Sequence, residues 1–117
     1  MSDAPAERPL VHLQQPGDLP ALQAFILALE ARQGWDREDM RTCLLHMGEE
    51  LGEVYEAARR WQAAPADRRA ERQAALGHEL VDVLNYLLAV ANRADIDLQA
   101  AFIEKNARNQ TRVWPAP

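Results

Sequence analysis

Apolar residues recur in this 117-residue chain at the spacing of an α-helix, and no stretch alternates apolar and polar residues as a strand would. Between residues 44 and 61, LLHMGEELGEVYEAARRW, most apolar side chains fall on one stripe of a helix. Leu and Ala supply most of the 48% of residues that are apolar, and this balance favours helix over sheet. The sequence therefore predicts an all-α fold.

Capping and helix-breaking residues divide this pattern into four helices. The boundary residues are Asp18, Pro20, Gly34, Asp36, Pro65 and Asp97. The predicted helices cover about residues 19–33, 37–62, 67–93 and 98–110. Four helices with short links predict a four-helix bundle. The proline-rich residues 1–17 are predicted to form an extended N-terminal arm, and residues 18–117 a single domain with one modest core.

Charge and composition exclude several classes of protein. The formal net charge is −5 and no basic block occurs, which argues against a nucleic-acid partner. The single cysteine, Cys43, excludes an internal disulfide. We expect no membrane partner, because no apolar run is judged long enough to span a bilayer and the start MSDAPAERPL lacks a signal-peptide core. A soluble, cytoplasmic protein is the expectation.

Carboxylates interrupt the apolar stripes of two predicted helices. Glu50 lies inside the stripe of the second helix, and Glu53 lies on its edge. In GHELVDVLNYLLAVA, residues 77–91, Glu79 and Asp82 share a face of a helix too apolar for the surface, so both are predicted to be buried. A buried carboxylate is costly unless it is paired or bound to a cation.

These four acids predict a site for a hard divalent cation, because carboxylate oxygens suit Mg²⁺ or Mn²⁺. The structural alternative is pairing with arginines of neighbouring helices, but neither stripe contains an arginine. A ferritin-like di-iron site would need Glu-x-x-His, and neither Glu50 nor Glu53 is followed by such a histidine. His46 is interpreted as a partner of these acids or as a packing residue.

The segments EELGE at 49–53 and ELVD at 79–82 resemble the EExxE and ExxD signature of the MazG-like, all-α nucleotide pyrophosphohydrolases. The resemblance covers about residues 19–115 and extends to the family's Lys, Asn, Arg and Pro pattern, here Lys105, Asn109, Arg112 and Pro115. Within the family, the chain resembles the small stand-alone members, including the dCTP pyrophosphatase type.

The resemblance implies Mg²⁺-dependent hydrolysis of a nucleoside or deoxynucleoside triphosphate to the monophosphate and pyrophosphate. It implies that Glu50, Glu53, Glu79 and Asp82 bind Mg²⁺, which Mn²⁺ could replace, and that water attacks the α-phosphorus. Glu49 is then a candidate for a further ligand or for the base that takes the proton of the water. Lys105, Asn109 and Arg112, which lie within two turns of one helix, are implied phosphate ligands.

Three aromatic residues, Trp35, Trp61 and Tyr86, are candidates to stack on the nucleobase, although Trp61 and Tyr86 also continue the core stripes. The base itself is left open. Since four short helices enclose little volume, the resemblance implies a homodimer or a dimer of dimers, and nucleotide-pool housecleaning as the purpose. The alternatives are a phosphoribosyl-ATP pyrophosphohydrolase and a non-catalytic helical interaction module.

Overall fold

The computed structural model describes residues 17–116, so the predicted N-terminal arm, apart from its last residue, lies outside the described part of the chain. The elements in chain order are α1 (Leu19–Gln33), η2 (Trp35–Arg37), α2 (Met40–Ala63), η3 (Ala66–Arg68), α3 (Arg69–Arg93) and α4 (Leu98–Thr111). No strand occurs within the described residues. The predictions of an all-α fold and of four helices are confirmed.

Local capping explains where most of these helices begin and end. Asp18 accepts a hydrogen bond from the Ala21 amide at 2.9 Å at the start of α1, and Asp97 does the same for Ala100 at 3.1 Å at the start of α4. Gly34 ends α1 with a left-handed φ of 79°, a conformation that glycine adopts without strain.

The predicted cap of the second helix is wrong. Asp39, and not Asp36, is the N-cap of α2, where it accepts a hydrogen bond from the Thr42 amide at 2.8 Å. Asp36 lies in η2, a single 3₁₀ turn that follows Gly34, and extended backbone at Glu38 separates this turn from α2. An extra turn, invisible to the apolar periodicity, therefore moves the start of α2 by three residues.

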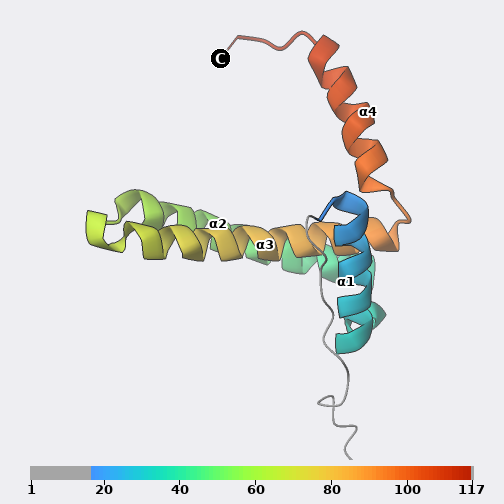
Figure 1. The fold of residues 1–117 in the computed structure, drawn as a ribbon, viewed down its shortest axis with the longest axis horizontal. Helices are drawn as coiled ribbons and strands as arrows, with labels where there is room; N and C mark the ends of the chain where they lie inside the picture. Colours follow the sequence, from blue (N-terminus) through green and yellow to red (C-terminus); the bar gives the residue numbers. More distant parts are fainter. Residues whose placement is uncertain (1–16, 117) are drawn as a thin grey trace, which may run out of the picture.

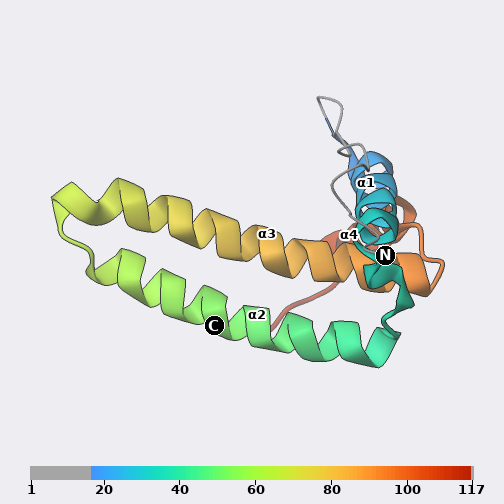
Figure 2. The ribbon, with the colours of Figure 1, turned by 90° about the horizontal axis from the view of Figure 1, so that it is seen from below.

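The two longest helices, α2 and α3, form an extended antiparallel hairpin, and α1 crosses the C-terminal half of α3 (Figure 1, Figure 2). The core lies at this crossing, where Ile26, Leu88 and Ala89 are buried. The helix α4 leaves the crossing and points away from the hairpin (Figure 1). The four helices therefore do not close into the expected bundle within one chain.

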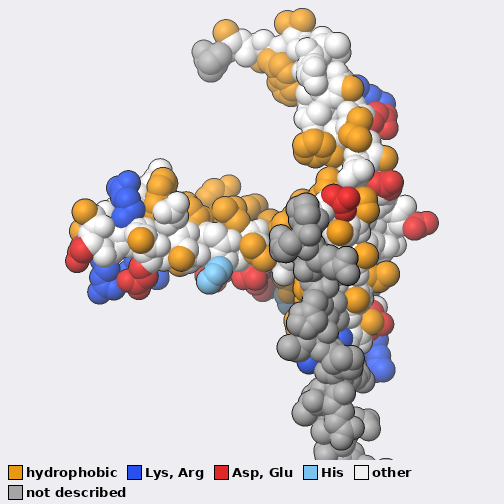
Figure 3. Space-filling view, in the orientation of Figure 1, with side chains coloured by type: hydrophobic (Ala, Val, Ile, Leu, Met, Phe, Trp, Pro, Cys, Tyr) orange, Lys and Arg blue, Asp and Glu red, His pale blue; other side chains and the backbone are white. Residues whose placement is uncertain are grey.

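Many large apolar side chains stay exposed, because no further helix among residues 17–116 covers the hairpin (Figure 3). They include Leu45 and Tyr55 on α2, Leu80 and Val81 on α3, and Phe102 and Ile103 on α4. Exposed apolar surface on this scale is typical of an interaction site.

One helical stretch, Ala66–Arg93, is long and apolar enough to cross a membrane by length and composition, with a mean hydropathy of 1.3 over 18 residues. The sequence expectation that no run reaches this length is therefore wrong. Length and composition alone are weak evidence for a membrane span, since the core helices of soluble proteins can be equally long and apolar. Glu79 and Asp82 lie near the middle of the stretch, where carboxylates are costly in lipid.

Candidate functional site

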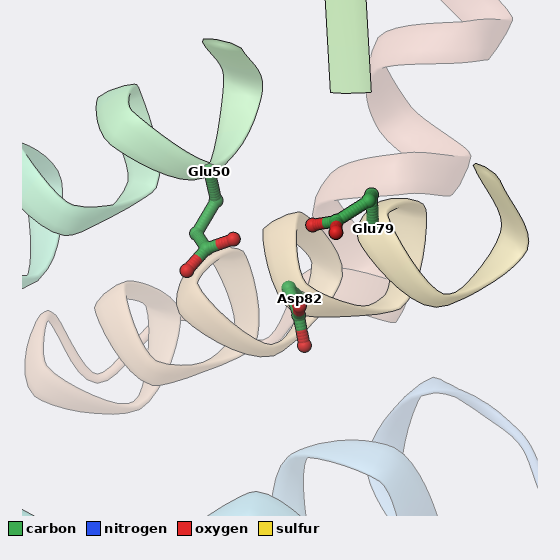
Figure 4. A group of neighbouring side chains, drawn as sticks. All are labelled: Glu50, Glu79 and Asp82. Carbon is green, nitrogen blue, oxygen red and sulfur yellow. The ribbon is translucent and has the colours of Figure 1, made fainter. Parts of the chain in front are cut away.

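Three of the predicted acids meet between the two helices of the hairpin. Glu50 comes from α2, Glu79 and Asp82 come from successive turns of α3, and their side chains project toward the same space (Figure 4). One carboxylate oxygen of each lies within 4.8 Å of the other two. Glu50 and Glu79 are half-buried, but Asp82 is exposed, so the prediction that both α3 acids are buried fails for Asp82.

The electrostatics of this group favour a cation. Burial raises the pKa of the Glu50 carboxyl, and the neighbouring carboxylates of Asp82, Glu79, Glu53 and Glu49 raise it further. Within residues 17–116, none of the three clustered acids forms a salt bridge, so the described chain shows no sign of the arginine-pairing alternative. The group therefore offers oxygen ligands and negative charge without a cationic partner from the described chain, and a hard divalent cation fits it.

The other two acids of the EELGE segment lie beside the group and not in it. Glu53 is exposed and is not one of the three clustered carboxylates, although its charge acts on Glu50. Glu49 is exposed, and its Oε2 lies 3.6 Å from Nδ1 of His46. The His46 ring in turn lies 5.7 Å from the ring of Tyr86. His46 thus lies next to Glu49, the candidate general base, and next to Tyr86, a candidate for stacking on the nucleobase.

A pocket of about 370 Å³ adjoins the acid group and is lined by α1, η2, α2 and α3. Glu50 and Asp82 form one part of its lining, and Trp35 and Tyr86 another. The pocket is large enough for a nucleoside-sized ligand. The structure therefore places two of the three predicted stacking residues in the same pocket as two of the clustered acids.

Four predicted binding residues lie away from this pocket. Trp61 is near the end of α2, where the guanidinium of Arg69 lies 5.6 Å from its ring. The others, Lys105, Asn109 and Arg112, belong to α4 or the residue after it. Lys105 and Arg112 are exposed, and α4 points away from the hairpin (Figure 1). Within one chain these residues are not brought to the acids.

Sequence reasoning missed four polar residues that build or line the pocket: Glu30, Glu38, Asn85 and Arg93. Asn85 follows Asp82 by three residues, so the same-face argument that paired Glu79 with Asp82 could have found it. No local signal identifies Glu30 and Arg93, because 63 residues separate these ion-paired side chains.

Comparison with known proteins agrees with this geometry. Residues 38–114, more than half of the chain, match the MazG nucleotide pyrophosphohydrolase domain. The chain belongs to the MazG nucleotide pyrophosphohydrolase family, as its EELGE and ELVD segments predict, and is therefore a member of an enzyme family.

Two similar proteins carry a more particular name. dCTP pyrophosphatase 1 of Mus musculus is 32% identical over 115 residues, covering 94% of this chain and 66% of the mouse protein. dCTP pyrophosphatase 1 of Rattus norvegicus is 36% identical over 87 residues, covering 70% of this chain and 51% of the rat protein. The matched part of the chain thus spans between about half and two thirds of the length of these curated relatives.

Proposed function

We propose that this chain hydrolyses a nucleoside or deoxynucleoside triphosphate to the monophosphate and pyrophosphate, using Mg²⁺ or Mn²⁺. The observation that carries the proposal is the convergence of Glu50, Glu79 and Asp82 beside a nucleoside-sized pocket, which Glu50 and Asp82 line together with Trp35 and Tyr86. Family membership supports the reaction, and the names of the two relatives make dCTP the first substrate to test.

Glu50, Glu79 and Asp82 would hold the metal, and Glu53, whose charge acts on Glu50, is the candidate for a further ligand. When bound there, Mg²⁺ supplies positive charge to the triphosphate and makes a coordinated water more acidic. Glu49 is the candidate to take the proton of the attacking water, since it is exposed next to the group and His46 lies close enough to orient its carboxylate. Trp35 and Tyr86 orient the base by stacking.

We also propose that a second copy of the chain completes the site. The phosphate-binding candidates Lys105, Asn109 and Arg112 do not reach the acids within one chain, and the Trp61 side chain lies outside the pocket. Only 17% of the most apolar 18-residue window of α3 is buried. A homodimer or a dimer of dimers would cover this surface and could bring α4 of one copy to the acids of another.

The proposed role is housecleaning of the cytoplasmic nucleotide pool. The test is a panel of ribo- and deoxyribonucleoside triphosphates, together with phosphoribosyl-ATP, scored by pyrophosphate release with Mg²⁺ and with a chelator. Release from one or more nucleoside triphosphates, only with metal, is the expected result. Turnover of phosphoribosyl-ATP alone would assign the chain to that reaction. No turnover and no Mg²⁺-dependent stabilisation would indicate the non-catalytic interaction module.

A further inference from the structure

Arg93, near the C-terminal end of α3, uses all five of its N–H donors in hydrogen bonds. Two go to the Glu30 carboxylate, at 2.9 and 2.6 Å, and the other three go to backbone carbonyls. The acceptors are the carbonyls of Glu38 at 2.8 Å, Trp35 at 3.0 Å and Ala89 at 3.1 Å. The Arg93 side chain is 15% exposed and that of Glu30 is 9% exposed, so this ion pair is largely shielded from water.

Two of these acceptors belong to the short segment that joins α1 to α2. This segment carries Trp35 and Glu38, and the side chains of both residues line the pocket. The segment has little order of its own, because η2 is a single turn that has no side-chain cap. Trp35, which is half-exposed, lies at the pocket and stacks on no other aromatic ring among residues 17–116. Arg93 therefore supplies bonds that fix this backbone against α3.

We propose that Arg93 is a positioning residue for the pocket that Trp35 and Tyr86 line. It holds the 35–38 segment so that Trp35 can stack on the nucleobase, and the Glu30 carboxylate neutralises the charge of Arg93. This inference rests on the proposed function, since it assigns base binding to the same pocket. Arg93 does not touch the reacting phosphates and acts through Trp35. A planar fork with five donors can serve all of these acceptors at once, whereas a lysine has three donors on one nitrogen.

Steady-state kinetics on the best nucleotide of the panel separate positioning from stability. Arg93→Lys keeps a charge for Glu30 and loses the fork, and we expect KM to rise about tenfold while kcat changes little. The double variant Glu30→Leu with Arg93→Met removes both buried charges, which restores stability that Arg93→Met alone loses. Its KM should nevertheless stay high, because the carbonyls of Trp35 and Glu38 still lack their donor. A normal KM in a stable double variant would overturn the proposal.

A second measurement needs no turnover. In protein labelled with 5-fluorotryptophan, the ¹⁹F resonance of Trp35 should shift and broaden in Arg93→Lys, while those of Trp61 and Trp114 stay in place. Arg68→Met is the matched control, because the Arg68 side chain makes an exposed ion pair with Glu71 at 2.9 Å and does not line the pocket. An unchanged Trp35 resonance in Arg93→Lys would overturn the positioning role. If the Trp35 resonance shifts in Arg93→Lys but the wild type hydrolyses no nucleotide, the proposed reaction alone is overturned and the positioning role stands.

Discussion

Replacing Asp82 by Asn should stabilise the metal-free chain and destabilise it relative to wild type in Mg²⁺. Asp82 is one of three carboxylates whose oxygens lie within 4.8 Å of one another, and the amide keeps the shape of the side chain while removing its charge. In metal-free Asp82→Asn, the repulsion of this side chain by Glu50 and by Glu79 disappears. When a cation is bound, the substitution replaces one carboxylate ligand of the metal by a weaker amide ligand. The sign of the effect therefore depends on the metal.

The size of each effect follows from the geometry. At 4.8 Å, two unit charges in a water-like medium repel by just under about 1 kcal/mol, and Asp82 takes part in two such pairs. Since these groups are partly exposed and salt screens them, we expect metal-free stabilisation of about 1 kcal/mol. Mg²⁺ at a hundred times its dissociation constant should stabilise the wild type by about 2.7 kcal/mol. For 117 residues that corresponds to a rise in Tm of about 10 °C.

Thermal unfolding followed by far-UV circular dichroism, in chelator and over a series of Mg²⁺ concentrations, measures both effects. The curves of Tm against Mg²⁺ for wild type and Asp82→Asn should cross. Asp67→Asn is the matched control, because Asp67 lies in η3 at the far end of the hairpin and outside the acid group. Its curve should follow that of the wild type. Equal Mg²⁺ shifts in wild type and Asp82→Asn, or a metal-free Asp82→Asn that melts lower, would refute the assignment.

Three further results are expected. Glu53→Gln should abolish pyrophosphate release while helical content stays unchanged, and turnover like that of the wild type would remove Glu53 from the site. Lys105→Ala should lower kcat/KM at least about tenfold and leave the Mg²⁺-dependent rise in Tm intact, because lysine is not a Mg²⁺ ligand. Hydrolysis in ¹⁸O-labelled water should label the monophosphate, as mass spectrometry can show, whereas label in orthophosphate would indicate attack at the γ-phosphorus.

The sequence predicts the helices well because their ends are set by local interactions. Asp18, Gly34 and Asp97 bond to backbone groups within four residues, so their roles as helix caps can be predicted from the sequence alone. The choice of Asp36 as the cap of the second helix is wrong because it, too, uses local signals alone. A 3₁₀ turn has no apolar periodicity of its own, and two aspartates three residues apart are equally good caps on sequence grounds.

The acid group is predictable in part, because the stripe of each helix fixes which carboxylates face its partner. That argument places Glu50, Glu79 and Asp82 together, but it does not fix how deeply they lie. Exposure depends on what covers the hairpin, and no local spacing determines that. The pocket is harder to predict from the sequence than the acid group. The Glu30–Arg93 ion pair beside it forms only because α1 crosses α3, and local spacing does not reveal that crossing.

The core adjoins one part of the pocket, and the acid group lies further along α3. Ile26, Leu88 and Ala89 pack at the crossing of α1 and α3, next to the network of Arg93. Asp82 lies six residues before Leu88, about 9 Å along the helix axis, and its side chain is exposed. Within one chain, the Arg93 network therefore lies beside the core, whereas Asp82 of the acid group stays exposed. This arrangement agrees with our proposal that α4 of a second copy supplies Lys105 and Arg112 to the acid group.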